Sequence, residues 1–527
     1  MRISTQQYFD TSSAKYQDNY SGVVKAQDQA SSGVRVQTAA DDPVAAAQLL
    51  MLQQQKDMLG QYSGNITSLQ NSLTNEESVL ASINTAMQTA SGLALQAGNL
   101  KLSNDDRKAI AAQVGALEDQ VLGLLNTKDS SGNYMFSGAK TDTPPYSRNN
   151  DGTYTYQGDE TPLSLQVSSN LTIAAGDTGK TLLESSGNTG RTQATILPPA
   201  VNDGKVAISA GLVTSGTAYT KNFADGQPYK LTFSSSTQYS VTDKDGNDVT
   251  SEITGNGTFD STKEGASSVN LRGVKFDISL NLGSDVASGA PSDALVAGKA
   301  FTLESKPDTF SSSRTASNPS TAQLTGGRVT DQAAYASTFP NSGAVIKFTS
   351  GNDYEVYAQP YSANSKSIAT GTMATGATSI TAAGVTFDVS GAPGAGDQFS
   401  VSATSNKNMN ALDTLGQLRK ALETPADGDP VAMNKLKDVI NTSIGNLANA
   451  SAQIDQVRGS IGARQNALDI QSQENTSLGL ANTSTMSSLA NVDMGQAAID
   501  LTLQQTMLQA SQLAFVKISQ LSLFSRM

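Results

Sequence analysis

The chain has 527 residues, of which 37% are hydrophobic and only 16% charged, with a formal net charge of −12 and no Cys, His or Trp. The negative charge argues against binding to nucleic acid or to an anionic membrane surface, because phosphate binding requires clustered Lys and Arg. Without Cys and His there is no thiolate or imidazole catalysis, no disulfide and hardly any zinc chemistry. We therefore expect no cofactor, no metal and no enzymatic activity.

The sequence contains no run of about 18 consecutive apolar residues, so it predicts no membrane-spanning helix. Residues 1–8 also lack the apolar stretch of a secretory signal peptide. We expect a protein that stays in the cytosol, or that leaves the cell by a route that cleaves no signal.

The first predicted element is an amphipathic helix over residues 5–29, too polar to bury a core by itself. Its apolar positions include Tyr8, Tyr20 and Val23. We assign residues 1–45 to an N-terminal assembly helix that pairs with residues 485–527.

Residues 46–140 are predicted to be the N-terminal half of a helical rod. Apolar residues recur there every seven positions, which is typical of a coiled-coil seam: Leu52, Leu59, Ile66, Leu73, Leu80, Met87 and Ala94. Gln55 and Glu76 interrupt the companion series three residues further on. A shorter helix follows, with Ser103 or Asn104 as its N-cap.

The middle of the chain is rich in Gly, Thr and alternating apolar residues, which indicates strands and turns. We divide it into a β-rich segment at 141–199, a first β module at 200–305 and a second at 306–405. Three sequence blocks recur in the same order in both modules; for example, residues 229–233 (YKLTF) are echoed by 345–348 (VIKF). The two modules are therefore predicted to be related.

One acidic segment of the first module, residues 243–248 (DKDGND), resembles the first half of a calcium loop. Its Gly is not at the sixth position, and Thr254 stands where a bidentate Glu is needed. We expect a type I′ hairpin turn at Asp245-Gly246 instead of a metal site.

Residues 406–484 are predicted to be the C-terminal half of the rod, with Asp429 and Pro430 as helix start. A second seven-residue repeat runs through this half: Met433, Ile440, Leu447, Ile454, Ile461 and Leu468. The fold class is thus multi-domain α+β: both chain ends form a long antiparallel helical coiled-coil rod, and β-rich domains are inserted in the middle. The expected rod core is Leu59, Ile66, Leu73, Leu80, Ile440, Leu447, Ile454, Ile461 and Leu468.

The last helix, from about residue 496 to 524, is apolar on two opposite faces. One face carries Leu501, Leu508 and Phe515, and we expect it to point outward. The other carries Ile499, Leu503, Leu513 and Leu521. A helix with two apolar faces must be sandwiched between partners, so these residues, together with Tyr8, Tyr20 and Val23, form the expected assembly interface. A contact between different patches of identical subunits generates rings or helical assemblies.

Several segments resemble the flagellin family. Residues 30–36 (ASSGVRV) and 40–43 (ADDP) are similar to its N-terminal motif, and residues 454–458 (IDQVR), 461–466 (IGARQN) and 518–524 (ISQLSLF) to its C-terminal one. Within the family, residues 132–138 (GNYMFSG) resemble the members that join hook to filament, whereas residues 112–118 (AQVGALE) depart from the pattern of filament-forming flagellins.

The resemblance implies a secreted, extracellular subunit of the bacterial flagellum that forms a homo-oligomer. It also implies hook-associated protein 1 and flagellin as neighbours, and an export chaperone at the C-terminal helix. The alternatives are a filament-forming flagellin, an adhesin that uses the central β modules, and an enzyme in the insert.

Overall fold

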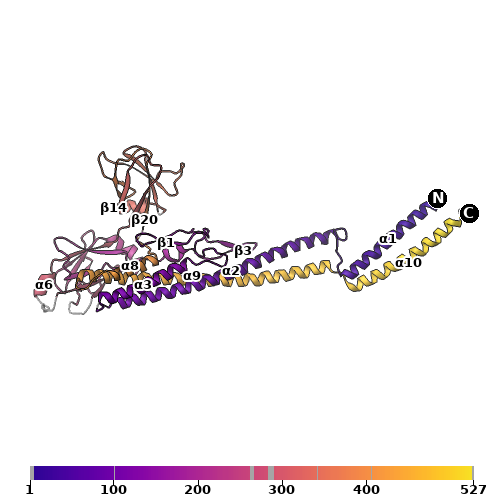
Figure 1. The fold of residues 1–527 in the computed structure, drawn as a ribbon, viewed down its shortest axis with the longest axis horizontal. Helices are drawn as coiled ribbons and strands as arrows, with labels where there is room; N and C mark the ends of the chain where they lie inside the picture. Colours follow the sequence, from indigo (N-terminus) through magenta and orange to yellow (C-terminus); the bar gives the residue numbers. More distant parts are fainter. Residues whose placement is uncertain are drawn as a thin grey trace. The chain divides into compact units, whose positions relative to one another are not determined.

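The structure is a computed structural model, and it describes residues 5–99, 101–260, 266–282, 290–340, 342–404 and 406–524. The chain forms two compact units. Unit 1 comprises Met1–Thr74, Leu163–Ala175 and Ile461–Met527, and unit 2 comprises Asn75–Pro162 and Gly176–Ser460. Two long helices, α2 (Pro43–Ala97) and α9 (Pro430–Ala490), have residues in both units. Both helices are labelled in Figure 1.

Unit 1 is built from helices and one hairpin. Its helices are α1 (Thr5–Ser32), α10 (Met494–Phe524) and the adjoining parts of α2 and α9; its hairpin is β3 (Ser164–Ser168) and β4 (Leu171–Ala174). Side chains of both long helices bind the hairpin's backbone: Asn65 Nδ2 donates to the carbonyl of Gln166 at 2.7 Å, and Asn475 Nδ2 to that of Val167 at 3.1 Å. Polar positions on these helices therefore hold the hairpin in place.

The helical part of unit 2 consists of the other parts of α2 and α9, with α3 (Asn104–Leu125) and α8 (Ala411–Glu423). Charged and amide groups tie α2 to α9: Arg458 Nε donates to Glu77 at 2.9 Å, and Asn84 Nδ2 to Asp455 at 2.9 Å. Ser103 caps α3 with a reciprocal bond to Asp106. Asp429 caps α9 by accepting from the backbone N–H groups of residues 431 and 432, as the Asp-Pro start predicts.

The insert of unit 2 consists of short antiparallel strands with a few helical turns between them. Its strands are β1 (Tyr146–Arg148), β2 (Tyr154–Tyr156), β5 (Thr192–Ile196), β6 (Val206–Ile208), β7 (Leu212–Val213), β8 (Tyr229–Phe233), β9 (Tyr239–Thr242), β10 (Ser267–Leu271), β11 (Val274–Leu280), β12 (Ala300–Ser305), β13 (Thr309–Arg314), β14 (Gln323–Val329), β15 (Ala344–Phe348), β16 (Asp353–Ala358), β17 (Ala369–Thr372), β18 (Ser379–Ala382), β19 (Val385–Ser390) and β20 (Gln398–Thr404). The short helical elements are η1 (Lys180–Glu184), α4 (Gly216–Ala218), η2 (Tyr219–Phe223), α5 (Ala224–Gly226), η3 (Thr250–Glu252), α6 (Ala290–Val296) and α7 (Gln332–Thr338).

Two parts of the insert have the same strand pairing. In module 1 (β5–β12), one sheet has the order β5-β12-β8-β9 and the other contains β10-β11-β6; in module 2 (β13–β20), the orders are β13-β20-β15-β16-β17 and β14-β19-β18. The registers agree residue by residue: Phe233 faces Tyr239 in module 1, and Phe348 faces Tyr354 in module 2. Each module has its own apolar core. The repeated sequence blocks therefore correspond to a repeated fold.

The turn at Asp245-Gly246 is not the type I′ turn that we expected. A type I′ turn needs positive φ at both central residues, but among the described residues only Asn256, Arg272 and Ala383 are non-glycine residues with positive φ. Asp243 instead accepts hydrogen bonds from the backbone N–H groups of residues 245 and 247, and Gly246 has φ +83°. The hairpins with two positive φ values are at Arg272-Gly273 and Ala383-Gly384, at equivalent places in the two modules.

The predicted fold class is confirmed: helices form both ends of the described chain, and β sheets lie between them in sequence. One expected boundary needs correction, because β5 (Thr192–Ile196) pairs with β12 and so belongs to the sheet of module 1, before residue 200. Among the described helices, none combines the length and the apolarity that crossing a bilayer requires.

Candidate assembly interface

Helices α1 and α10 pack against each other in antiparallel orientation within unit 1. The rings of Tyr16 and Phe515 stack with centroids 6.2 Å apart, and Asn19 Nδ2 donates to Ser511 Oγ at 3.1 Å. At Gly22 the helices come so close that an added Cβ would lie 2.8 Å from Gln504 Oε1. Each helix thus covers one face of the other.

The turn between α1 and α2 connects this pair to the rest of unit 1. Gly33, with φ +69°, ends α1 in the left-handed conformation that glycine adopts without strain. Arg35 donates from its backbone N–H to the carbonyl of Ala490 at 2.6 Å and from its guanidinium to that of Leu489 at 3.1 Å. The last turn of α9 therefore gains partners for carbonyls that a helix end leaves unpaired.

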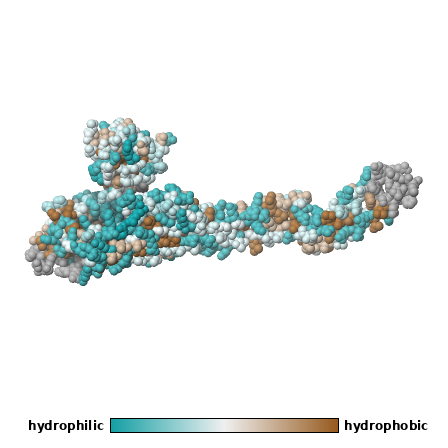
Figure 2. Space-filling model, in the orientation of Figure 1, coloured by the Kyte–Doolittle hydropathy of each residue, from teal (hydrophilic) through white to brown (hydrophobic). Residues whose placement is uncertain are grey.

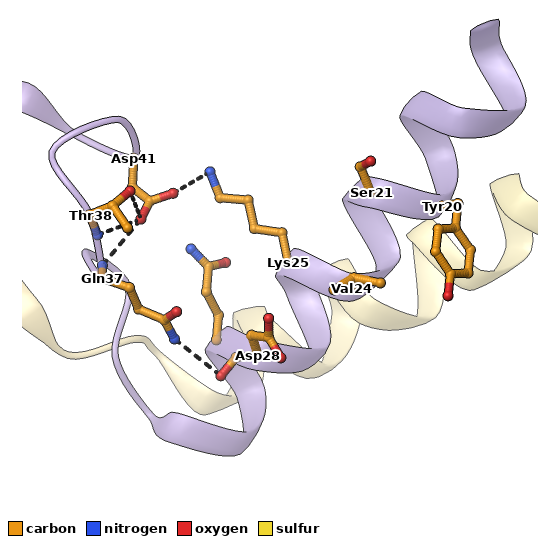
Figure 3. Close-up of a pocket in the computed structure, with 9 residues that line it drawn as sticks. Tyr20, Ser21, Val24, Lys25, Asp28, Gln37, Thr38 and Asp41 are labelled. Atoms are coloured by element: carbon orange, nitrogen blue, oxygen red, sulfur yellow. Dashed lines mark hydrogen bonds and ion pairs between the residues drawn. The ribbon is translucent and has the colours of Figure 1, made fainter.

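Two carboxylates hold this turn. Asp41 forms an ion pair with Lys25 at 2.6 Å and accepts from the backbone N–H groups of residues 37 and 38 (Figure 3). The hydrogen bond from Lys25 holds the pKa of Asp41 well below its usual range. Asp42 accepts from the N–H of Ala45 at 3.0 Å, which lowers its pKa and caps α2 ahead of Pro43.

Helix α10 presents two different faces. Its inner face packs toward α1, and the apolar residues there are one buried and three half-buried side chains: Ala497, Leu501, Leu508 and Phe515. The opposite side carries exposed residues at alternating steps of four and three, here called the α10 outer stripe: Ile499, Leu503, Thr506, Ala510 and Leu513. The exposed fractions are 62% for Ile499, 50% for Leu503 and 66% for Leu513.

The structure reverses the expected assignment of the two faces. Leu508 and Phe515 were expected to point outward, but Phe515 stacks on Tyr16 and Leu508 is half-buried. Val23 is half-buried, whereas Tyr20 is 56% exposed. The side chains of Tyr8 and Leu521 lie outside the described part of the structure.

The expected rod-core residues lie mostly inside. Leu59 is half-buried, and the other eight are no more than 3% exposed: Ile66, Leu73, Leu80, Ile440, Leu447, Ile454, Ile461 and Leu468.

Exposed apolar side chains are concentrated in unit 1. Of the 21 large hydrophobic residues that are exposed in the described part of the chain, 18 belong to this unit, although it is the smaller one. Apolar patches are visible along its helices (Figure 2). Large exposed apolar areas mark interaction surfaces in soluble proteins.

An open groove of about 370 Å³ lies between α1 and residues 37–41. The exposed side chains of Tyr20 and Val24 line it on the α1 side, together with Lys25 and Asp28 (Figure 3). Within the described residues, no cluster of three or more carboxylates is arranged to hold a metal ion.

The sequence indicated residues 30–43 only as a family motif and did not reveal what the individual residues of this motif do. Arg35 binds the end of α9, and Asp41 organises the turn. It also missed Asp493, which caps α10 by accepting from the N–H of Gly495 at 2.8 Å. An Asp directly before a long apolar-periodic segment is the signal that could have revealed this cap.

Comparisons with known proteins find sequences similar to this chain among flagellar proteins. Residues 3–141 match the model of the bacterial flagellin N-terminal helical region. The chain is 36% identical over 185 residues to flagellar hook-associated protein 3 of Salmonella typhimurium, an alignment that covers 35% of this chain and 57% of the relative. It is 35% identical over 192 residues to the Escherichia coli protein of the same name, again covering 35% and 57%.

Among solved structures, the flagellar junction protein FlgL of Legionella pneumophila aligns with a TM-score of 0.48 and 20% identity, covering 84% of this chain and all of that one. The sequence alignments span little more than half the length of the curated relatives. The chain is thus similar to flagellar hook-associated protein 3, as predicted, and opens with a region that matches the N-terminal helices of bacterial flagellins.

Proposed function

We propose that the chain is a structural, non-enzymatic subunit of the extracellular bacterial flagellum, which joins hook to filament by self-assembly of its terminal helices. The observation that carries this proposal is the α10 outer stripe. It has the spacing of a coiled-coil seam, but its residues are exposed while the opposite face of the same helix packs on α1.

Burial of the α10 outer stripe is a source of association free energy. Burying the side chains of Ile499, Leu503 and Leu513 contributes roughly 1.5–3 kcal/mol each when they leave water completely. Within one chain this contribution is not realised, because α1 occupies the other face. Association of several copies recovers it, and it must exceed the cost of immobilising the subunits.

The similarity to flagellar hook-associated protein 3 supports the proposed place between hook and filament. It also favours the expected partners, which are further copies of the chain, hook-associated protein 1, flagellin and an export chaperone at α10. A filament-forming flagellin remains the alternative.

Deletion of the gene in the bacterium that encodes the chain tests the proposal. Electron microscopy should show intact hooks without filaments, and the medium should contain unpolymerised flagellin. Loss of a flagellin would leave no such protein in the medium. Normal filaments in the deletion strain would refute the proposed role.

Complementation then tests the interface. A Leu503→Asp variant should be exported but should not restore filaments, because a carboxylate cannot be buried without a partner. Val201→Asp serves as the matched control: Val201 is 76% exposed, lies in unit 2 and should tolerate the change. Filaments restored equally by both variants would exclude the α10 outer stripe from assembly.

A further inference from the structure

Module 1 packs on α9 through a polar face. Its strand β11 and the segment of β6 and β7 line two cavities against this helix, each of about 10 Å³. Cavities of this volume are just large enough for one water molecule. Asp438 of α9 accepts a hydrogen bond from the backbone N–H of Ala210 at 3.0 Å. Asp277 lines both cavities, and Lys275 lines one of them. The contact is therefore close and made by polar groups.

Module 2 contains an equivalent segment. In module 1, β6 and β7 both pair with β11; in module 2, the single strand β14 pairs with β19 and has an irregularity at residues 326–327. Counted from the hairpin glycine of each module, Ile208 and Leu324 face the fifth residue, and Val213 and Val329 face the first. The two segments therefore correspond residue by residue.

The packing of the two segments corresponds as well. Residues 209–211 and 325–327, which lie between the matched pairs, each end in a glycine that approaches the other sheet of its module. A Cβ added to the first glycine would lie 2.6 Å from Thr192 Oγ1 of β5, and one added to the second would lie 2.5 Å from Phe310 Cβ of β13. Strands β5 and β13 are both edge strands at the same end of the two sheets. The two modules thus have the same backbone arrangement at this face.

The two faces carry similar charges but differ in exposure. In module 1, Lys275 lies 3.9 Å from Asp277; in module 2, Arg328 lies 3.3 Å from Asp388, the counterpart of Asp277. Beside α9 the side chain of Asp277 is 14% exposed, whereas that of Asp388 is 57% exposed. The members of the second face are all exposed, and we call them the module 2 open face: Gln323, Thr325, Gly326, Arg328, Asp388 and Ser390.

We infer that the module 2 open face docks an α-helix of another protein, in the way that module 1 docks α9. Gly326 supplies the backbone N–H that corresponds to that of Ala210, so the helix must offer a carboxylate, as Asp438 does. The residues near this carboxylate should be amides or small polar side chains, because Asn441 and Thr442 hold these places on α9. Such docking does not depend on the assembly of the terminal helices.

A second copy does not offer the side of α9 that fits this face. In each copy, module 1 already covers Asp438. The ion pair of Arg328 with Asp388 does not prevent docking, because the occupied face of module 1 contains the corresponding pair of Lys275 with Asp277. The occupant is therefore a polar, carboxylate-bearing helix of a different protein.

Transplanting the open face into module 1 tests whether this face can hold a helix. The transplant gives module 1 the side chains found at the corresponding positions of module 2: Ala207→Gln, Ser209→Thr, Ala210→Gly, Leu212→Arg and Lys275→Thr. Module 1 should stay on α9, so hydrogen exchange in residues 205–213 should remain within about twofold of that in the unmodified chain. The control is Asp438→Lys, which removes the carboxylate and should speed this exchange by on the order of tenfold or more.

Exchange in residues 229–242, which form the hairpin of β8 and β9, shows whether module 1 itself is folded. If this hairpin stays protected while residues 205–213 of the transplant exchange as fast as in Asp438→Lys, the open face cannot hold a helix and the proposed docking is wrong. If the hairpin loses its protection, the binding experiment with the unmodified module 1 decides.

A peptide tests docking between separate chains. The probe is a fluorescent peptide of residues 430–449 that carries Leu436→Ala, Ile440→Ala and Leu447→Ala, so it keeps the docking side of α9 but cannot enter the coiled-coil seam. It should bind the full-length chain saturably. A Thr325→Trp chain should bind it more weakly, by on the order of tenfold or more, because the indole ring occupies the face.

The matched control is Thr370→Trp, at an exposed position of β17 in the other sheet of module 2, which should leave binding unchanged. Fluorescence anisotropy measures all three chains. Equal binding to both Trp variants, or no saturable binding to the unmodified chain, would overturn the proposed docking. Weaker self-association of the Thr325→Trp chain in sedimentation velocity would also overturn it, because that result assigns the face to a second copy.

Discussion

Two helical regions of this molecule have the same kind of periodic sequence but opposite surroundings. In unit 2, the seam residues of α9 such as Ile440, Leu447 and Ile454 are at most 3% exposed. In unit 1, the three large residues of the α10 outer stripe, Ile499, Leu503 and Leu513, follow the same kind of spacing but are 50–66% exposed. A seven-residue repeat therefore specifies that a stripe will be buried, but not whether its partner lies in the same chain.

This difference separates stability from assembly. Buried seam residues of unit 2 contribute to the free energy of unfolding of one chain, whereas exposed stripe residues of unit 1 contribute only when copies meet. The same substitution in the two regions should consequently change different measurements.

The largest expected effect is that of Ile454→Asp. It removes a completely buried side chain and leaves a carboxylate without a partner in the seam, so the free energy of unfolding should fall by about 4 kcal/mol or more. Urea unfolding followed by circular dichroism measures it. Leu503→Asp is the matched change in α10 and should alter monomer stability by no more than about 0.5 kcal/mol. Equal destabilisation by both would abolish the distinction between the two regions.

Acidification should also separate the two units. In unit 2, burial raises the pKa of both Asp413 and Asp438 to about 6. The folded state then binds protons between pH 6 and about 4 that the unfolded state does not, so stability rises as pH falls from 7.5 to 5, by about 1.4 kcal/mol for each group. In unit 1, the lowered pKa values of Asp41 and Asp42 cause a loss of stability only below about pH 4.

Thermal unfolding at pH 7.5 and pH 5.0 checks whether stability rises on acidification. The Asp438→Asn variant should show a smaller gain on acidification, because its amide is neutral at both pH values. A melting temperature that falls between pH 7.5 and 5.0 would contradict the raised pKa values.

A smaller effect is expected for Phe515→Ala. Loss of the stacked ring on Tyr16 should weaken the α1–α10 pair by about 1–2 kcal/mol, since the side chain is only half-buried. Hydrogen exchange should become faster in residues 10–30 and 497–515 and stay unchanged in residues 430–460. Unchanged exchange in α1 would show that the ring does not hold the pair together.

The smallest effect is expected at the glycine that ends α1. Gly33→Ala forces a side chain into φ +69° and should destabilise the turn by about 1 kcal/mol. Gly60→Ala is the control: Gly60 lies inside α2 with no atom within 4 Å of an added Cβ, so this change should stabilise by a few tenths to about 1 kcal/mol. Unfolding experiments should show lower stability for Gly33→Ala and higher stability for Gly60→Ala. Such a pair of results would confirm the two backbone conformations.

Much of the fold was predictable because it depends on local periodicity. The repeats through Leu73 and Leu447 indicated long helices, Asp429-Pro430 indicated the start of α9, and the echoed blocks indicated two related β modules. Polar breaks in the repeats were less informative. Glu76 looks like a flaw in a seam, yet it is 2% exposed and accepts a hydrogen bond from the backbone of Asp177 at 2.9 Å, which attaches the insert to α2.

That α10 has two apolar faces follows from its residues alone, because helix geometry fixes the directions in which Ile499, Leu503, Leu508 and Phe515 point. Which of the two faces packs inside the chain depends on contacts with α1. Both faces are similarly apolar, and the choice depends on side chains of α1, such as Tyr16 and Asn19, that lie almost 500 residues away in sequence. Hydrophobic burial is non-directional, so the matching of rings and hydrogen bonds between α1 and α10 selects the inner face and leaves the other one exposed.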